Sequence, residues 1–191
     1  MIEIDAAVER TLDQQRDFTA LEADVRNSPR TGGTVDALVL RPDRDRRVVV
    51  AVAELDPDDG VIGDNWRARG SSSTPDGSAH PEAQVTLMST RVLAAIEPDN
   101  SRWALAGDQL LVDFDLSLEF LPAGSRIFVG EAELEISEKP HTGCAKFSAR
   151  FGSDALRWIN GPVGRELRFR GVNARVVRGG QVSVGDAIRK A

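Results

Sequence analysis

Short β-type runs at close spacing, from residue 33 onward, are the feature that most limits what this chain can fold into. "TVDALVL" (34–40) and "DQLLVDFDLS" (108–117) alternate apolar and polar residues, as half-buried strands do. "RRVVVAVAEL" (46–55) is a nearly continuous apolar run that predicts one buried strand, and "SRIFVG" and "AELEIS" predict a hairpin across Gly130-Glu131. Few helical segments separate these runs. The pattern favours a compact β-barrel or sandwich with helical additions over alternating βαβ units.

The N-terminal region has a different pattern. Residues 3–26 contain no glycine or proline, and their apolar residues recur at mostly helical intervals. This predicts an amphipathic helix that packs on the body, and Pro29 ends the pattern. We therefore expect an N-terminal helical extension over residues 1–30 and one mainly β domain over residues 31–191.

Two short helices and a long loop interrupt the β pattern. "STRVLAAIE" predicts a helix capped by Ser89, and "DALRWIN" predicts a helix entered from Ser153. "LRFR" (167–170) alternates and predicts one of the closing strands. The loop "NWRARGSSSTPDGSAHPEA" (65–83) is much longer than the usual connection of about 4–6 residues. Its composition is compatible with an ordered functional loop and with a floppy surface insertion.

Composition excludes several classes of protein. The formal charge of -6 and the single cysteine argue against attraction to nucleic acid and against an internal disulfide. No signal-peptide pattern is present, and no apolar run approaches the roughly 18 residues of a membrane span, so we expect a cytoplasmic protein without a membrane partner. Common nucleotide-binding, hydrolase and zinc-protease motifs are absent. The carboxylate pairs Asp113/Asp115 and Glu133/Glu135 have strand spacing, which predicts a solvated face.

Cys144 is the strongest candidate for chemistry because it follows the turn sequence "PHTG". If a helix begins there, the helix dipole and the free N–H groups favour a thiolate. Residues 139–178 contain nine Lys/Arg and two acids, a basic field that would also favour a thiolate and attract an anionic ligand. Free cysteines are, however, often buried packing residues, and Phe147 and Phe151 would share the helix face of the thiol. The residues alone leave a reactive and an inert Cys144 equally open.

The sequence on both sides of the thiol resembles a known family. "EISEKPHTGCAKFSARFGSDALRWIN", followed by "GRELRFRGVNARVVRGGQVSVGD", is similar to the C-terminal half of a MOSC domain, the module named for the C-terminal part of molybdenum cofactor sulfurase. "GTVDALVLRP", "DGVIGDNWRARG" and "AQVTLMS" resemble the first strand of the family, its Gly-Asp turn and loop, and its next strand. The likeness runs from Gly33 to Asp186. It implies a free-standing, bacterial-type member with a MOSC-type β-barrel, mainly β with a few short helices and an N-terminal helix.

The resemblance also implies a cleft for the molybdenum cofactor, a pterin that bears an anionic phosphate. Cys144 would either carry sulfur as a persulfide or ligate molybdenum, and a soft sulfur ligand suits a sulfur-rich molybdenum centre. His141 is a candidate to move a proton or to hydrogen-bond the sulfur; the alternative is a turn histidine that faces water. The candidates for contact with the cofactor are Lys146, Arg150, Arg170, Arg175, Asp64, Trp66, Arg67 and Arg69.

Three functions follow from this resemblance. The leading one is a cofactor-binding protein that uses Cys144 in sulfur carriage or metal-sulfur transfer. The others are a molybdenum-dependent reductase of N-hydroxylated compounds and a non-catalytic cofactor-binding module, as a monomer or homodimer. Free-standing bacterial reductase members usually have a helical C-terminal extension and a different cysteine setting, which favours the sulfur role here. Sulfurase-type relatives receive sulfur from a pyridoxal-phosphate cysteine desulfurase, so we expect a desulfurase or redox partner and no pyridoxal phosphate on this chain.

Overall fold

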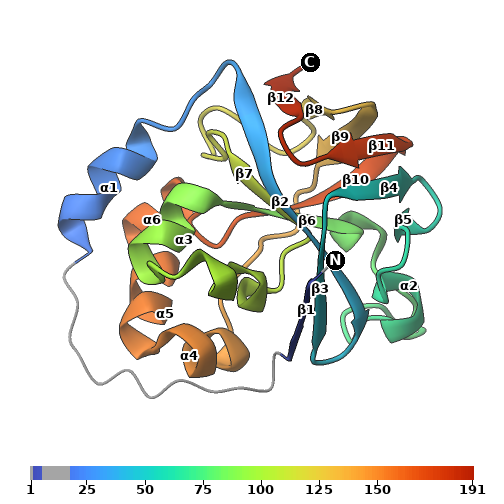
Figure 1. Ribbon diagram of the computed structural model, residues 1–191, viewed down its shortest axis with the longest axis horizontal. Helices are drawn as coiled ribbons and strands as arrows, with labels where there is room; N and C mark the ends of the chain where they lie inside the picture. Colours follow the sequence, from blue (N-terminus) through green and yellow to red (C-terminus); the bar gives the residue numbers. More distant parts are fainter. Residues whose placement is uncertain (1, 6–17) are drawn as a thin grey trace.

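A closed β-barrel forms the centre of the molecule (Figure 1). The computed structural model describes residues 2–5 and 18–191. In this part of the chain, seven strands close in the order β2-β12-β8-β9-β10-β6-β7, and β7 pairs back with β2. The pairs in this circle are antiparallel except for the parallel pair β6–β7. The strands of the circle are β2 (Gly33–Asp43), β6 (Val85–Ser89), β7 (Leu110–Asp113), β8 (Arg126–Val129), β9 (Ala132–Ile136), β10 (Val172–Arg178) and β12 (Ala187–Lys190).

Smaller elements extend and cover the barrel. β3 and β1 continue the large sheet beyond β2, and a second sheet has the order β11-β4-β5. The helices α3 to α6 and η2 lie together on one side of the barrel, and α2 lies beside the second sheet (Figure 1). The strands are β1 (Ile2–Asp5), β3 (Arg46–Val50), β4 (Val52–Asp56), β5 (Gly60–Val61) and β11 (Gly180–Ser183). The helices are α1 (Thr19–Arg26), α2 (Trp66–Arg69), η1 (Pro81–Ala83), α3 (Thr90–Ile96), η2 (Asn100–Ala106), α4 (Ala145–Phe151), α5 (Ser153–Asn160) and α6 (Pro162–Glu166).

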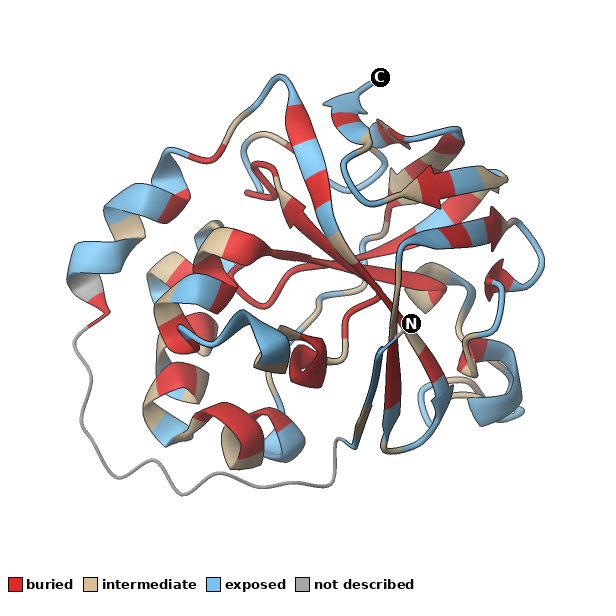
Figure 2. Ribbon diagram, in the orientation of Figure 1, coloured by how far each residue is buried: buried red, intermediate tan, exposed pale blue. Residues whose placement is uncertain are grey.

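Two hydrophobic clusters explain why some strands are apolar on both faces. In β6, Leu87 belongs to the cluster inside the barrel, whereas Met88 belongs to the cluster shared with the helices. In β7, Leu110 belongs to the cluster inside the barrel and Leu111 to the cluster shared with the helices. Figure 2 shows the buried residues concentrated along these strands and on the helix faces turned toward them. The predicted mainly β barrel with short helices is therefore confirmed.

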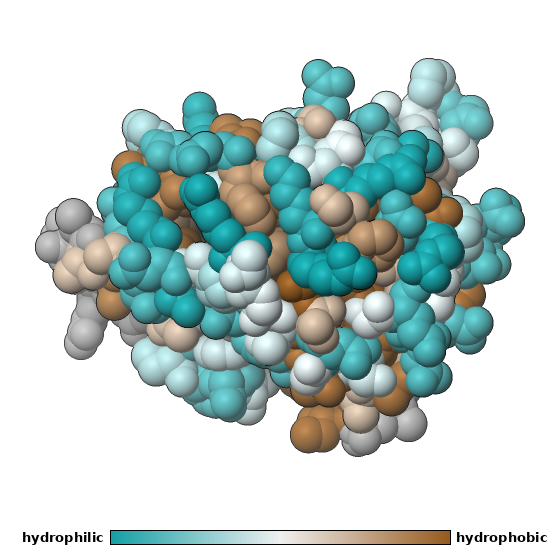
Figure 3. Space-filling view, turned by 90° about the horizontal axis from the view of Figure 1, so that it is seen from above, coloured by the Kyte–Doolittle hydropathy of each residue, from teal (hydrophilic) through white to brown (hydrophobic). Residues whose placement is uncertain are grey.

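One face of the molecule is mostly polar. The face in Figure 3 carries mainly hydrophilic side chains with small hydrophobic areas between them. Each helix in residues 2–5 and 18–191 is too short or too polar to cross a bilayer.

The beginning of the chain differs from the predicted helix. Residues Ile2–Asp5 form strand β1, which pairs antiparallel with β3. Ile4 packs against the hydrophobic cluster on the helix side, whereas Ile2 is exposed. The prediction of helix over residues 3–5 is wrong because a partner strand more than 40 residues away in the sequence supplies backbone hydrogen bonds.

The predicted N-terminal helix is present only in its last part. Helix α1 spans Thr19–Arg26. The part of the predicted helix over residues 6–17 lies outside the described residues. Phe18 and Val25 pack into the cluster on the helix side, so α1 lies on the body as expected. The division of the chain at residue 30 stays a prediction.

Two predicted strands are also wrong. The run over residues 46–55 is divided at Ala51 into β3 and β4, which belong to different sheets. "LRFR" (167–170) forms the turn between α6 and β10 instead of a strand. Arg168 has a φ of 51°, and both Phe169 and Arg170 are buried, so the alternation does not mark a wet strand face.

The two carboxylate pairs have different environments. Asp115 is buried, and its Oδ2 accepts a hydrogen bond from Arg30 Nε at 2.8 Å, so the predicted solvated face is wrong there. Glu133 and Glu135 are partly exposed and pair with Arg126 at the surface.

Candidate functional site

Cys144 lies at the start of helix α4, a placement that the sequence had left open. Its backbone is extended, and its carbonyl oxygen accepts the N–H of Ser148 at 3.1 Å, so Cys144 is the N-cap residue. Cys144 is exposed, whereas Phe147 and Phe151 are buried in the cluster on the helix side. The alternative of a buried packing thiol is therefore wrong.

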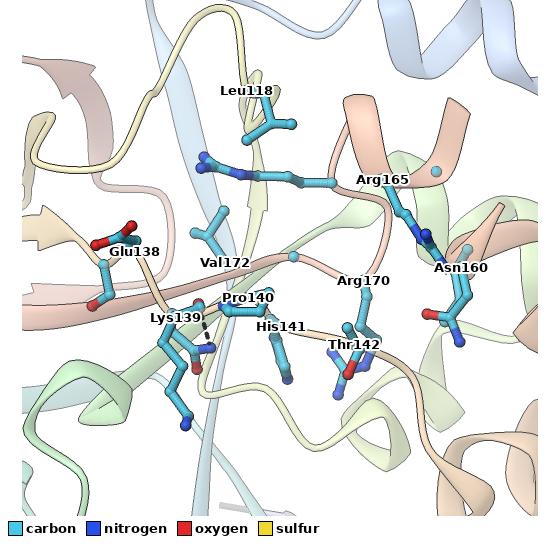
Figure 4. Close-up of a pocket in the computed structure, with 16 residues that line it drawn as sticks. Leu118, Glu138, Lys139, Pro140, His141, Thr142, Asn160, Arg165, Arg170 and Val172 are labelled. Atoms are coloured by element: carbon cyan, nitrogen blue, oxygen red, sulfur yellow. Dashed lines mark hydrogen bonds between the residues drawn. The ribbon is translucent and has the colours of Figure 1, made fainter. Parts of the chain in front are cut away.

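A cavity of about 380 Å³ lies beside the segment that leads to the thiol (Figure 4). Thr142 lines it, and Cys144 follows two residues later without lining it. Apolar side chains such as Leu118 and Val172 form part of the wall. Its basic and amide lining consists of Lys139, Arg165, Arg168, Arg170, Asn160 and Asn173.

Three polar atoms in side chains of this wall are buried without a hydrogen-bond partner: Ser137 Oγ, His141 Nδ1 and Arg170 Nε. Most buried polar atoms in native proteins have a partner, so each exception needs an explanation. The basic lining and these incomplete hydrogen bonds fit a polar, anionic ligand.

His141 lies half-buried in the cavity wall beside a carboxylate, with its Nδ1 atom buried. Its Nδ1 lies 3.4 Å from Asp108 Oδ1. Burial holds the pKa of His141 well below its ordinary value, and the nearby cations Arg170 and Arg41 lower it further. The ring is therefore neutral, and the contact with Asp108 is not an ion pair. The Nδ1 side of the ring faces Asp108 and the interior of the protein, unlike a turn histidine that faces only water.

Asp108 and Arg170 form a buried ion pair in the same wall. Arg170 Nη1 lies 2.6 Å from Asp108 Oδ2, and the guanidinium also lies over the ring of Phe147. Burial raises the pKa of Asp108, and the attraction to Arg170 opposes that rise. Arg170 is thus fixed by its partners before any ligand is present.

Arginine side chains converge on the backbone at the end of η2. Three guanidinium groups donate to three successive carbonyl oxygens there, so positive charge is concentrated at this end of η2. The donors and acceptors are Arg150 to Leu105 at 2.9 Å, Arg170 to Ala106 at 3.0 Å, and Arg41 to Gly107 at 3.0 Å.

Arg41 and Arg47 also belong to this group, and the sequence did not indicate them. Arg41 makes a two-fold contact with the buried Asp64, with Nε–Oδ2 at 2.8 Å and Nη2–Oδ1 at 3.0 Å. Arg47 is buried and donates to the carbonyl oxygens of Arg44 and Arg46. Burial, together with repulsion from Arg150 and Arg41, lowers the pKa of Arg47 to about 10.

Two predicted basic residues lie near the thiol and share one acid. Lys146 Nζ lies 3.1 Å from Asp45 Oδ1, and Arg150 Nη2 lies 3.6 Å from the same oxygen. Of the predicted site residues, His141 and Arg170 line the cavity.

The other residues predicted to contact the cofactor lie outside the cavity, and most of them make contacts within the protein. Trp66 is buried, and its Nε1 donates to the carbonyl oxygen of His80 at 3.2 Å. Arg67 pairs with Asp59, and Arg175 Nη2 lies 2.8 Å from Glu135 Oε1, both at the surface. Arg69 is exposed in α2. Arg67, Arg69, Arg175, Asp64 and Trp66 do not line this cavity.

The described residues contain no group of three or more His, Cys, Asp or Glu side chains that could hold a metal ion. A metal at this site would therefore need most of its ligands from a bound cofactor, with at most a single thiolate from the chain.

Comparisons with known proteins agree on the fold. The chain is similar to the crystal structure of YuaD from Bacillus subtilis, with a TM-score of 0.57, 18% identity, and coverage of 84% of this chain and 96% of that chain. YiiM from Geobacillus stearothermophilus gives a TM-score of 0.56 and 14% identity, with coverage of 83% and 75%. YiiM from Escherichia coli gives a TM-score of 0.53 and 18% identity, with coverage of 83% of this chain and 69% of that chain. A search of curated proteins found no match.

The sequence also matches a family profile. The profile of the MOSC domain covers residues 74–189, which is more than half of the chain and includes the cavity lining and the thiol. This family is generally associated with binding of the molybdenum cofactor. The chain therefore belongs to the MOSC domain family.

Proposed function

We propose that this protein binds the molybdenum cofactor in the cavity beside the thiol segment and uses Cys144 for sulfur carriage or metal-sulfur transfer. The observation that carries the proposal is that one short segment contributes both to the cavity wall, through His141 and Thr142, and to the exposed thiol of Cys144. The family membership supports the identity of the ligand.

The lining of the cavity suits a phosphate-bearing heterocycle. Its volume lies within the range of about 300–1,000 Å³ that is common for small-molecule sites. Lys139 and Arg165 would hold the phosphate, because both are basic and line the cavity. Asn160 and Asn173 offer amide donors and acceptors for the edge of a pterin. The bound cofactor would supply a molybdenum centre with sulfur ligands.

Cys144 would accept sulfur by an exchange that balances without an external oxidant. Its thiolate attacks the outer sulfur of a donor persulfide, R–S–SH. A new S–S bond forms on Cys144, the S–S bond of the donor breaks, and the donor leaves as the thiolate R–S⁻. A cysteine desulfurase persulfide is the class of donor that this requires. Exposure of Cys144 supports such a step because a partner protein has to reach the sulfur.

His141 would serve as a neutral proton acceptor in the wall. Its lowered pKa keeps the imidazole uncharged near neutral pH, and because Nδ1 is buried against Asp108, the other ring nitrogen, Nε2, would be the one to accept a proton or a hydrogen bond.

The test is metal and pterin analysis of protein produced in a host that makes the cofactor. We expect molybdenum and pterin to copurify with the wild-type protein in equal amounts. Arg165→Gln removes an exposed cation of the cavity and should lower this content, whereas Arg175→Gln removes an exposed cation outside it and should not. Wild-type protein without molybdenum or pterin would contradict the proposal.

Cys144→Ala separates the possible roles of the thiol. Cofactor retained by the variant, together with a persulfide on Cys144 of the wild type by mass spectrometry, supports sulfur carriage. Loss of molybdenum from the variant supports metal ligation, and turnover of N-hydroxylated bases would then favour the reductase. Full retention with no persulfide and no turnover would leave a binding module and overturn the proposed role of the thiol.

A further inference from the structure

Asn160, the last residue of α5, touches both the cavity and the thiol segment. Its Oδ1 accepts the backbone N–H of Gly143 at 3.1 Å, and its Nδ2 donates to the carbonyl oxygen of Gly143 at 3.3 Å. The same side chain lines the cavity (Figure 4). One amide therefore satisfies both backbone groups of the residue that precedes Cys144.

Gly143 lies so close to α5 that a side chain at this position would force two side chains of the helix to move. A Cβ atom at this position would be 2.7 Å from Ile159 Cδ1 and 2.7 Å from Leu156 Cδ1. The missing Cβ allows the backbone to approach the helix and brings the peptide groups within reach of Asn160.

The other contacts of this segment lie further from the thiol. Asn173 Nδ2 donates to the carbonyl oxygen of Lys139 at 3.1 Å, and His141 Nδ1 lies 3.4 Å from Asp108 Oδ1. Cys144, in contrast, is exposed. Among the described contacts of this segment, the pair of bonds from Asn160 is the one that lies directly before the thiol.

Helix α5 is a rigid support for this contact. Ala155 and Ile159 are buried, and the ring of Trp158 packs between Phe18 at 4.7 Å and Phe169 at 4.4 Å, measured between ring centroids. Gly143 is thus held in place by a helix that is anchored in the hydrophobic core, and not only by its neighbours in the loop.

We propose that Asn160 is the positioning residue for Cys144: it holds the peptide of Gly143 against α5, so that the thiol stays at the N-terminus of α4 beside the cavity. The proposal rests on the proposed function only for the task of the thiol. Asparagine suits this role because it carries a donor and an acceptor, whereas aspartate offers only acceptors and leucine, which is similar in size, offers neither.

Hydrogen exchange of the cofactor-free, full-length protein tests the contact. In Asn160→Leu, we expect the Gly143 amide to exchange about fivefold faster or more, because its hydrogen bond is lost. Asn160→Asp keeps the acceptor and should retain most of the protection. Arg157→Lys, an exposed change one turn earlier in α5, is the matched control and should behave as the wild type. Faster exchange throughout the barrel in Asn160→Leu would indicate a general structural role and overturn the proposal.

Alkylation of Cys144 by iodoacetamide tests the consequence for the thiol. Asn160→Leu should change the alkylation rate by roughly threefold or more at neutral pH, because the thiol loses the fixed, exposed position that it holds at the start of α4. Gly143→Ala should change the rate in the same direction by displacing the segment from α5 without changing Asn160. An unchanged rate in both variants, or changes in opposite directions, would overturn the proposal. Neither measurement involves the cofactor, so this inference and the proposed function can fail independently.

Discussion

Arg170 and Asp108 illustrate, at the scale of single residues, how partners distant in sequence determine a side chain's role. They are 62 residues apart, and both are buried. The basic composition around Cys144 pointed to Arg170 but gave no sign of Asp108 or Arg41. Asn160 was also missed, because an asparagine at the end of an amphipathic helix carries no signal of its contact 17 residues earlier. Cys144, in contrast, could be singled out as a candidate because a lone thiol after a turn is a local feature.

Removing Arg170 should destabilise the fold strongly. In Arg170→Met, Asp108 would remain buried without its cation, and breaking a buried pair in this way costs about 3–5 kcal/mol of unfolding free energy. Arg175→Met is the control, because Arg175 pairs with Glu135 at the surface and should cost about 0–1 kcal/mol. Urea denaturation of both variants measures the difference. Equal losses of unfolding free energy in the two variants would show that groups other than Arg170 compensate the buried charge of Asp108.

At the scale of elements, the sequence patterns correctly predicted strands that pair with their neighbours in the chain. The hairpin across Gly130-Glu131 is present, with Val129 opposite Ala132. The strand over residues 46–55 was predicted as one element because its apolar run is continuous, but its two halves pair with different sheets. Sequence periodicity reports burial and not the identity of the partner strand, and this is why the division at Ala51 and the strand β1 were missed.

Gly171 lies between α6 and β10, and its substitution should destabilise the fold more than substitution of a comparable glycine. Its φ is +93°, and a Cβ would lie only 2.0 Å from the carbonyl oxygen of Leu87 in β6. Gly185 has a φ of +91°, but a Cβ added there would meet no atom within 4 Å. Gly185→Ala should therefore cost only the backbone strain, about 1–3 kcal/mol. Gly171→Ala should cost a further 1–3 kcal/mol, roughly, because β6 and β10 must separate.

Thermal or urea unfolding of the two glycine variants, measured side by side, checks this difference. Similar stabilities would mean that β10 can shift away from β6 without loss. That result would argue against a tightly packed barrel wall next to the cavity.

At the scale of the whole molecule, the family resemblance predicted the barrel, and the charge distribution was only partly predictable. The chain has a formal charge of -6, yet four of the residues that line the cavity are Lys or Arg. The count of basic residues over 139–178 indicated a local positive field. It could not separate Arg165, which lines the cavity, from Arg157 and Arg175, which pair with acids at the surface. That separation depends on the folding of α5, α6 and β10 around one space.

The dependence of stability on pH is a property of the whole molecule to which His141 makes a defined contribution. In the folded protein its pKa is well below the ordinary value, whereas in the unfolded chain it should be about 6.5. Below about pH 6.5, the unfolded chain therefore binds a proton that the folded protein does not, so the unfolding free energy falls as the pH drops. Above that pH, both states are neutral at this residue and its contribution is constant.

His141→Gln should remove this contribution. We expect the wild type to lose up to roughly 1.4 kcal/mol per pH unit relative to the variant below about pH 6.5, with parallel curves above it. The groups that face His141 are Asp108, Arg170 and Arg41. Asp108 acts in the opposite direction, because its raised pKa lets the folded protein take up a proton first as the pH falls, and it is present in both proteins. Urea unfolding from about pH 7.5 to 5.5 measures the difference, and coincident curves would mean that His141 is protonated as easily in the folded protein as in the unfolded chain.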